Sequence, residues 1–460
     1  MKPRRILAFF AAIMVVLILM SLVISDDGIR FAGLQLRYPT MQSIIQSAKE
    51  SQRRIRNEKH IPPEMAQLRD SITFYQDLID SSDIRFWLPS EDYLDPFWQA
   101  SETAEVDGRT YRILHYGDSQ IEMDHITARL RSYMQQTFGG GGPGMLPVSI
   151  ITPIPSVHLG TSGDLSHLAS FGDSNAVRSR GNYGPMMQSF RLEGTVAVSM
   201  KTSSNKNIDE RTKRFNHISL VYNNLGGTVN ATVNTNLKNG SKGISAFKWS
   251  LDSTDRFQLR VSGNADLYAL LVDCGSGIAV DNIPMRGCSG QQFTLVNQDK
   301  LKTAYHQMDI GMIILQFGGN SVPYFKNTES IETYCTSIGK QLDHLHMCCP
   351  DARIVFVGPS DMGRRKSGQF QTYPILPELI DSLISTCLAH NAAYWSIYHA
   401  MGGENSMADW VAQGLAGKDY IHFSQRGADM MGDRLAEAFA NSYTLFRLKR
   451  RMKTEHLEGK

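Results

Sequence analysis

Hydrophobic and polar positions follow two different periods along this chain. Apolar residues recur at helical spacing in residues 121–138, 331–347, 378–390 and 428–446. Short apolar runs typical of buried strands occupy residues 111–116, 267–272, 310–316, 354–357 and 393–397. Strands that alternate with helices predict a mainly parallel sheet with helices on both faces. We therefore expect an α/β domain built from residues 98–149 and 265–446.

Residues 150–264 have a different pattern. Short segments of alternating polarity, such as 215–222 and 228–233, are separated by clusters of Gly, Asn and Ser. This pattern is typical of antiparallel strands joined by turns. We therefore expect an inserted all-β module after the first helix of the α/β domain.

The first 26 residues are predicted to be a membrane anchor. Residues 6–24 are apolar except for one serine, and they follow three basic residues. Their length suits a bilayer crossing at 1.5 Å per residue, and the basic flank predicts a cytoplasmic N-terminus. A cleaved signal peptide is the alternative, although Leu22 and Val23 crowd the positions where cleavage needs small residues. We expect a single-pass protein of the inner membrane, with its catalytic domain in the periplasm or outside the cell.

Two polar segments flank the predicted domains. Residues 27–97 contain many Gln, Glu, Arg and Lys residues with scattered apolar ones, and Pro62-Pro63 interrupts them. We interpret this segment as a helical spacer that holds the catalytic part away from the membrane. Residues 447–460 form a basic tail, most simply a solvated helix end.

Composition narrows the function classes. The 460 residues are 42% hydrophobic and 20% charged, which is an ordinary globular balance. The formal charge of +2 lacks the basic excess of a general nucleic-acid binder. The six cysteines permit disulfides, but their spacing names no pairing. His344, His346 and Cys348 are two apart on a predicted helix and do not share a face, so we interpret them as structural rather than as metal ligands.

Four short motifs carry candidate chemistry. Gly117-Asp118-Ser119 lies at a predicted strand-to-helix turn, where a serine hydroxyl is exposed and its N–H lies at a helix N-terminus. Taken alone this tripeptide is weak, because residues 172–174 repeat it in the β-rich region.

The other three motifs follow later in the chain. Gly290 comes after a strand and a loop, Asn320 follows the strongest apolar strand, and Asp419 and His422 precede the final helix. Each alone has an ordinary explanation as a turn glycine, a loop cap or a surface histidine. Together they all occur where predicted strands end, which is the edge at which open α/β sheets bind ligands.

This ordered set resembles the SGNH hydrolase superfamily, also called GDSL-like esterases. The four matching blocks are Gly117-Asp118-Ser119, Gly290, Gly318-x-Asn320 and Asp419-x-x-His422. Gln120 departs from the aliphatic residue that many members carry there. The resemblance implies a flavodoxin-like parallel sheet and a serine esterase that needs no metal or other cofactor.

A narrower likeness is to the peptidoglycan O-acetylesterases. Those proteins are exported and carry a jelly-roll-like β module between the first two blocks, and residues 138–144 are similar to their glycine-rich loop. The resemblance implies that Ser119 is the nucleophile, His422 its base and Asp419 the residue that orients His422. It also implies an oxyanion hole made by the Ser119 and Gly290 N–H groups and the Asn320 amide.

Several alternatives remain open from the residues alone. His115 and His125 lie near Ser119 in sequence and are rival bases. The resemblance implies an O-acetylated glycan as substrate, and the near-neutral charge speaks against a nucleic-acid partner. The same triad would also serve a glycan O-acetyltransferase supplied by a membrane-bound acyltransferase partner. A non-catalytic glycan-binding protein is the third hypothesis.

Overall fold

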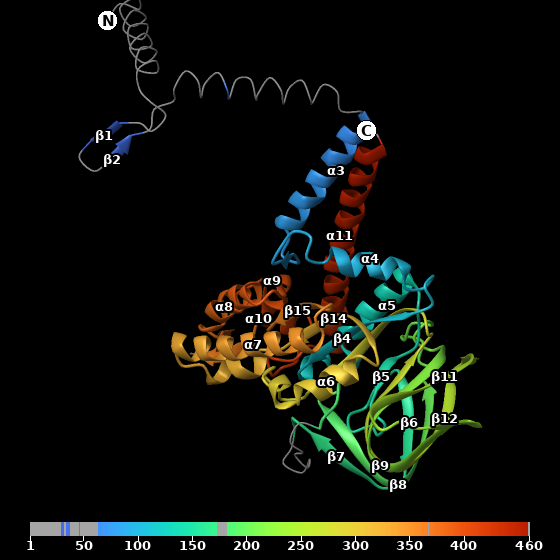
Figure 1. Cartoon of the computed structure of the whole chain (residues 1–460). Helices are drawn as coiled ribbons and strands as arrows, with labels where there is room; N and C mark the ends of the chain where they lie inside the picture. The colour runs from blue at the N-terminus through green and yellow to red at the C-terminus, as the bar shows by residue number, and fades with distance from the viewer. Residues whose placement is uncertain are drawn as a thin grey trace, which may run out of the picture. The chain divides into compact units, whose positions relative to one another are not determined.

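The computed structural model describes residues 29–31, 34–36, 46, 63–172, 182–366 and 368–458 (Figure 1). The predicted membrane anchor lies outside these residues. Among the helices that are described, none is both long and apolar enough to cross a membrane. Phe74–Lys449 form one compact unit, to which the following description applies. The elements beyond or across its limits are β1 (Ile29–Phe31), β2 (Leu34–Leu36), α3 (Pro63–Asp80) and the end of α11 (Gln425–Glu458).

A six-stranded sheet forms the centre of this unit. Its strands, in spatial order, are β13 (Gly277–Pro284), β4 (Thr110–Gly117), β14 (Asp309–Gln316), β15 (Arg353–Gly358), β18 (Ala393–Ser396) and β3 (Phe86–Trp87). The first five are parallel, and the short β3 is antiparallel at the edge. Numbered along the chain, the parallel strands have the order 2-1-3-4-5, which is the flavodoxin-like order. The predicted α/β sheet is confirmed.

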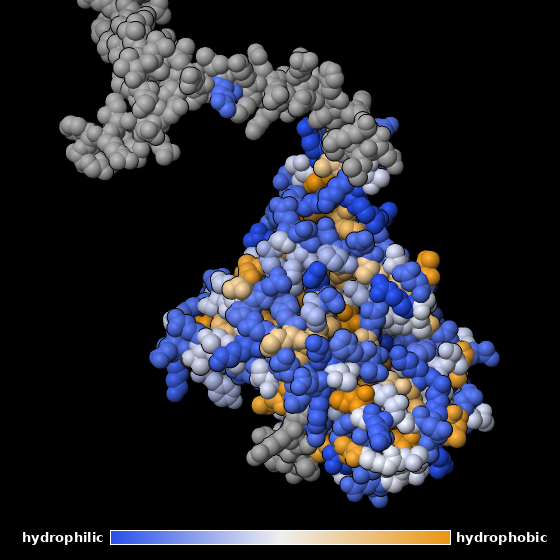
Figure 2. Space-filling view, viewed as in Figure 1, coloured by the Kyte–Doolittle hydropathy of each residue, from blue (hydrophilic) through white to orange (hydrophobic). Residues whose placement is uncertain are grey.

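Helices cover both faces of this sheet, because its strands are apolar on both sides. On β14, Ile313 and Leu315 belong to one buried cluster and Met312 and Ile314 to the other. The first cluster is completed by α6 (Gln298–Tyr305), α7 (Thr328–Cys348) and α8 (Leu376–Ala389). The second is completed by α4 (Asp95–Thr103), α5 (Thr127–Phe138), α9 (Ile397–Met401), α10 (Ser406–Ala412) and α11. The face in view in Figure 2 is largely hydrophilic, with hydrophobic positions scattered over it.

An eight-stranded antiparallel sheet accounts for most of residues 144–273. Its strands are β5 (Gly144–Leu146), β6 (Val157–Ser162), β7 (Leu165–Ala169), β8 (Gln188–Thr202), β9 (Phe215–Val233), β10 (Asn236–Asn239), β11 (Gly243–Thr254) and β12 (Arg256–Asp273). The sheet has its own core, in which Trp249 is buried. That these strands form a separate jelly-roll-like insertion stays a prediction, as do the predicted domain boundaries.

Two strand predictions were wrong in detail. Residues 267–272 were expected in the parallel sheet, but they are the end of β12 in the antiparallel one. Their side chains are buried without alternation, so their pattern imitates a central parallel strand. The strand that occupies this place in the parallel sheet is β13, which was not predicted. The two strands expected at 215–222 and 228–233 are one strand, β9.

Two helix predictions also need correction. The helix expected at 121–138 is a short 3-10 turn, η1 (Ser119–Asp124), followed by α5. Met123, Asp124 and Ile126 separate the two with φ near +60°. Helix α5 ends where the glycine run begins, as predicted, with Gly139 at its C-cap and φ +76°. The final helix continues to Glu458, so most of the predicted basic tail is helical.

Candidate active site

Ser119 lies at the C-terminal edge of the parallel sheet. Strand β4 ends at Gly117, and Ser119 is the first residue of η1. The turn is tight, because a Cβ atom on Gly117 would lie 3.0 Å from the side chain of Ile121. The Asp118 carboxylate stabilises the turn by accepting the Gln120 N–H at 3.0 Å. The local sequence thus places the Ser119 hydroxyl above the sheet edge.

The structure brings Ser119, His422 and Asp419 into one chain of hydrogen bonds. The Ser119 Oγ atom is 2.9 Å from His422 Nε2. The His422 Nδ1 atom is 2.8 Å from Asp419 Oδ2. The other oxygen of Asp419 accepts the backbone N–H groups of Ile421 and His422, each at 3.1 Å. A serine, a histidine and an aspartate in this order have the geometry of a nucleophile, a base and the group that orients the base.

The charge of Asp419 suits that arrangement. Partial burial acts to raise the pKa of the Asp419 carboxyl, but hydrogen bonds from the His422 side chain and the two backbone N–H groups outweigh it. The pKa of Asp419 therefore lies below its ordinary value, and the group is ionised at neutral pH. An ionised Asp419 accepts a hydrogen bond from the N–H at His422 Nδ1. The other ring nitrogen, Nε2, is then free to take the Ser119 proton.

Gln120 ties the serine turn to the histidine loop. Its side-chain Nε2 donates to the Ile421 carbonyl at 2.8 Å, and its Oε1 accepts the Phe423 N–H at 3.4 Å. These two partners flank His422 in the chain. From the sequence, Gln120 was only a departure from the pattern of the resembling family. In the structure, its side chain joins the serine turn to the loop that carries His422.

The three predicted oxyanion donors differ in availability. Asn320 Nδ2 donates to Asp118 Oδ2 at 3.0 Å and to the Cys288 carbonyl at 2.9 Å, which uses both amide hydrogens. In the part of the chain that is described, the backbone N–H groups of Ser119 and Gly290 donate to no protein acceptor. Ser119 borders the pocket, whereas Gly290 is buried and does not line it. Asn320 must exchange one of its two hydrogen bonds before it can donate to a ligand.

Gly290 occupies a position that requires glycine. Its φ is +85°, and a Cβ atom there would lie 3.0 Å from the Phe317 ring. Gly290 does not line the pocket above Ser119, but it packs against Phe317, which does. The backbone of Gly290 can approach this wall only because it has no side chain.

Two buried groups beside the triad have altered acidity. Asp118 is 4% exposed, and burial raises its pKa to about 6, although hydrogen bonds from the Gln120 N–H and from Asn320 act in the opposite direction. Burial also raises the pKa of the Cys288 thiol to about 12. The thiol therefore stays protonated at neutral pH and does not compete with Ser119 as a nucleophile.

A pocket of about 180 Å³ opens over Ser119 and His422. Ser119, His422 and Asn320 contribute to it, and Tyr324 lies on its wall with 79% of its surface exposed. The remaining lining residues are Asp118, Gln120, Gln316, Phe317, Gly319, Pro323, Gly358, Pro359, Ser360, Met362, Ile397 and Ile421. The pocket is large enough for a small acyl group and lies next to the serine hydroxyl.

The two rival histidines are directed elsewhere. His115 is buried in β4, where its ring nitrogens lie 3.1 Å from Gln316 Oε1 and 2.9 Å from Thr127 Oγ1. Burial lowers the pKa of His115 to about 3, so it is neutral. His125 pairs with Gln425 at 3.0 Å. The histidine that contacts Ser119 is His422.

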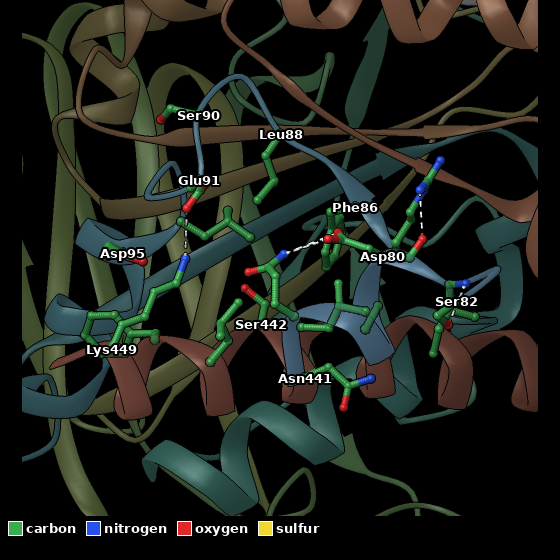
Figure 3. Close-up of a pocket in the computed structure, with 18 residues that line it drawn as sticks. Asp80, Ser82, Phe86, Leu88, Ser90, Glu91, Asp95, Asn441, Ser442 and Lys449 are labelled. Carbon is green, nitrogen blue, oxygen red and sulfur yellow. Dashed lines mark hydrogen bonds and ion pairs between the residues drawn. The ribbon is translucent and has the colours of Figure 1, made fainter. Parts of the chain in front are cut away.

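Larger hollows elsewhere contain none of the predicted catalytic residues. One of about 210 Å³ lies between α11 and residues 76–95, and Figure 3 shows Lys449 bonded to Glu91 across it. Another of about 480 Å³ is lined by residues within 143–172 and 186–188, by Arg131 and Arg286, by two residues of β13 and by the end of η1. Cavity volume alone therefore does not single out the candidate site. The hydrogen-bonded Ser119, His422 and Asp419 side chains do.

The remaining cysteine and histidine candidates have structural surroundings. All six cysteines are free thiols, and four of them are buried. His346 bonds to the His390 carbonyl at 3.2 Å, and the Cys348 thiol donates to the Gln298 carbonyl at 3.7 Å. Within the described ranges, no three His, Cys, Asp or Glu side chains gather as a metal site would require.

Comparison with known proteins identifies the fold. No protein-family model matches the chain, and no curated protein matches it either. A solved structure described as "Peptidoglycan O-acetylesterase in action, 5 min" aligns with a TM-score of 0.63 at 21% identity, over 78% of this chain and 96% of the other. This likeness confirms the SGNH resemblance at the level of the fold.

Two further matches are more distant. A family two carbohydrate esterase from Cellvibrio japonicus has a TM-score of 0.27 at 9% identity, over 63% of this chain and 99% of the other. The periplasmic domain of a lipopolysaccharide acetyltransferase from Salmonella ser. Paratyphi A has a TM-score of 0.27 at 13% identity, over 36% and 74%. At these scores neither match carries an argument about this chain.

Proposed function

We propose that this chain is an SGNH-type serine esterase that removes O-acetyl groups from a cell-envelope glycan such as peptidoglycan. One observation carries the proposal: Ser119, His422 and Asp419 form a hydrogen-bonded chain at the sheet edge, at distances of 2.9 and 2.8 Å, beside a pocket. The fold shared with a peptidoglycan O-acetylesterase supports the choice of an acetylated glycan.

The first half of the reaction transfers the acetyl group to the protein. Ser119 Oγ attacks the ester carbonyl carbon while His422 Nε2 takes the hydroxyl proton. Ionised Asp419 stabilises the imidazolium that forms. The carbonyl oxygen becomes an oxyanion, and in this proposal the Ser119 and Gly290 N–H groups donate to it. When the intermediate collapses, the bond to the sugar oxygen breaks and His422 returns its proton to that oxygen.

The second half releases acetate. A water molecule gives a proton to His422 Nε2 and attacks the acetyl carbon, and the bond to Ser119 Oγ then breaks. His422 protonates Ser119, which restores the starting state, and the products are acetate and a sugar hydroxyl. If a second sugar hydroxyl takes the place of this water, the same steps transfer the acetyl group instead.

The pocket supports a short acyl group. Its volume is about 180 Å³, and Phe317, Met362 and Ile397 supply apolar wall atoms. A long acyl chain needs a deeper apolar channel than this wall provides.

We further propose that the protein acts from the inner membrane, with its catalytic domain in the periplasm or outside the cell. The basis is the apolar segment at residues 6–24 and its basic flank. A membrane-bound acyltransferase partner belongs to the transferase alternative.

Reaction with a fluorophosphonate probe tests the nucleophile directly. Such probes form a covalent bond to a serine only where a base activates it. Peptide mass spectrometry should locate the label on Ser119 in the wild type. The label should be absent from His422→Ala and unchanged in Ser385→Ala, which removes an exposed hydroxyl on α8. Labelling of His422→Ala at the wild-type rate would refute the proposed base.

A further inference from the structure

The outer face of the antiparallel sheet forms a groove. Strands β6, β8 and β12 lie side by side there (Figure 1), so their outward residues stand in rows across the strands. One row is His158, Lys201 and Arg256, and the next is Gly160, Ser199 and Gln258.

A third row continues the groove. It contains Ser162, Ala197, Arg260 and Thr232, the last from β9.

The side chains along the middle of the groove are small. Gly160, Ser199 and Ala197 form its floor, and longer side chains rise on either side. Two adjoining hollows of about 660 and 550 Å³ share Gly160, Ser199, Asn234 and Gln258. The alternate residues of β8 and β12 face inward, where they form the sheet's own core. The groove is therefore wide and open, and its exposed side chains are polar or charged.

The charges of the groove are of one sign. Its lining includes Lys201, Arg256 and Arg260, together with His158, and it includes no Asp or Glu. Arg256 pairs with the neighbouring Asp255 at 2.8 Å. Lys201 and Arg260 form no ion pair with any of the described residues. Two cations thus remain available to a ligand, beside the hydroxyl and amide groups of Ser199, Gln258 and Asn234.

We propose that this groove binds a polysaccharide that carries carboxylate groups. A flat polar floor of small side chains leaves room for sugar rings, and hydroxyl and amide groups exchange hydrogen bonds with sugar hydroxyls. Lys201 and Arg260 attract carboxylates along the same polymer. The exposed side chains that line the groove are polar or charged, so its chemistry suits a hydrophilic, anionic polymer and not an acyl chain.

The groove extends the proposed function. A second binding site on the same chain would hold the protein on an acetylated polymer between turnovers. The effective concentration of esters near Ser119 would then be higher. Binding to the groove requires no turnover, so its failure can be told apart from failure of the esterase proposal.

Co-sedimentation with insoluble O-acetylated peptidoglycan tests the groove. The full chain in mild detergent is compared with the double variant Lys201→Ser/Arg260→Ser. The matched control is Lys238→Ser/Lys248→Ser, which removes two exposed lysines from β10 and β11 outside the groove. We expect the groove variant to bind roughly tenfold more weakly, with the control unchanged. The difference should shrink at high salt, which screens exposed charges.

A second variant tests the shape independently of charge. Ser199→Tyr places a large side chain on the groove floor and should also weaken sedimentation, while hydrolysis of 4-nitrophenyl acetate stays at the wild-type rate. The proposal is overturned if the groove variants sediment like the wild type. It is equally overturned if vesicles of anionic phospholipid retain the protein through Lys201 and Arg260 more strongly than peptidoglycan does. Groove-dependent binding by a wild type without esterase activity would refute only the proposed function.

Discussion

Asn320 has two roles at the scale of a single residue. Its amide holds Asp118 and the Cys288 carbonyl at 3.0 and 2.9 Å, and its side chain lines the pocket beside Ser119 as the predicted third oxyanion donor. In Asn320→Ala we expect kcat for a small acetyl ester to fall about 10²–10³-fold, with KM nearly unchanged. Steady-state kinetics checks this. A loss below threefold would exclude Asn320 from the oxyanion hole.

Gln120 holds the loop that carries His422, the proposed base. Its side chain links η1 to Ile421 and Phe423 on either side of His422. Gln120→Leu should lower kcat roughly 10- to 100-fold, because His422 then loses its register with Ser119. Gln425→Leu is the matched control, since Gln425 holds His125 and not the triad. Equal rates for both variants would show that the link to Gln120 is unimportant.

Tyr324 presents an aromatic ring at the pocket wall. Its 79% exposure leaves most of the ring in water, and such rings are well suited to pack against the apolar face of a sugar. Tyr324→Ala should lower kcat/KM on acetylated glycan about tenfold, and Tyr324→Phe should restore it. The rate on 4-nitrophenyl acetate should change little in either variant. A parallel loss on both substrates would indicate a structural role instead.

At the scale of the element, the segment between η1 and α5 is strained. Met123, Asp124 and Ile126 all have φ near +60°, where side chains clash with the backbone. Met123 is exposed, so Met123→Gly relieves this clash with little loss of packing. We expect the free energy of unfolding to rise by about 1 kcal/mol. Met123→Ala, which shortens the side chain without freeing φ, should give no such gain in urea denaturation.

This break also shows what the periodicity of a sequence leaves out. Leu130 and Met134 are buried on one side of α5, and Ile126 continues their helical spacing just before it, so the helix was predicted. At the break before it, Arg131 bonds to Asp124 at 2.5 and 2.9 Å inside the protein. Such a contact between a turn and a helix leaves no regular spacing in the sequence. Strand β13 was missed for a related reason, because β12 presents the stronger apolar run nearby.

At the scale of the whole molecule, Asp118 couples stability to pH. Its pKa is about 6 in the folded protein, above its ordinary value of 3.8. Folding therefore favours its protonated form. The stability that this provides is complete below about pH 3.8 and is lost as the pH rises through about 6. The loss is roughly 3 kcal/mol.

The variant Asp118→Asn isolates this contribution, because its neutral side chain cannot ionise. Relative to the wild type, its free energy of unfolding should rise between pH 4 and pH 7 by a large part of that amount. Urea denaturation at the two pH values measures the difference. If the gap between the variant and the wild type is the same at both, Asp118 does not titrate in this range.

The assembly of the site could be predicted in outline from the chain. The candidate residues were expected at the ends of predicted strands or in the loop before the last helix: Ser119, Gly290, Asn320, Asp419 and His422. The structure joins the serine, the histidine and the aspartate by hydrogen bonds.

The supporting contacts could not be predicted. The bridge from Gln120 to Ile421 joins residues 301 positions apart, and the bond from Asn320 to Asp118 spans 202. No local pattern encodes such distances. The outer groove was equally hidden, because its charges come together only through the pairing of β6, β8 and β12.

The central claim is that Ser119 cleaves acetyl esters of a glycan. Acetate released from O-acetylated peptidoglycan tests it most directly, with the wild type measured beside Ser119→Ala. We predict release by the wild type and a loss approaching 10⁶-fold in the variant, as for removal of a serine nucleophile. Equal release by both proteins, or no release by the wild type with or without an added sugar acceptor, would contradict the account.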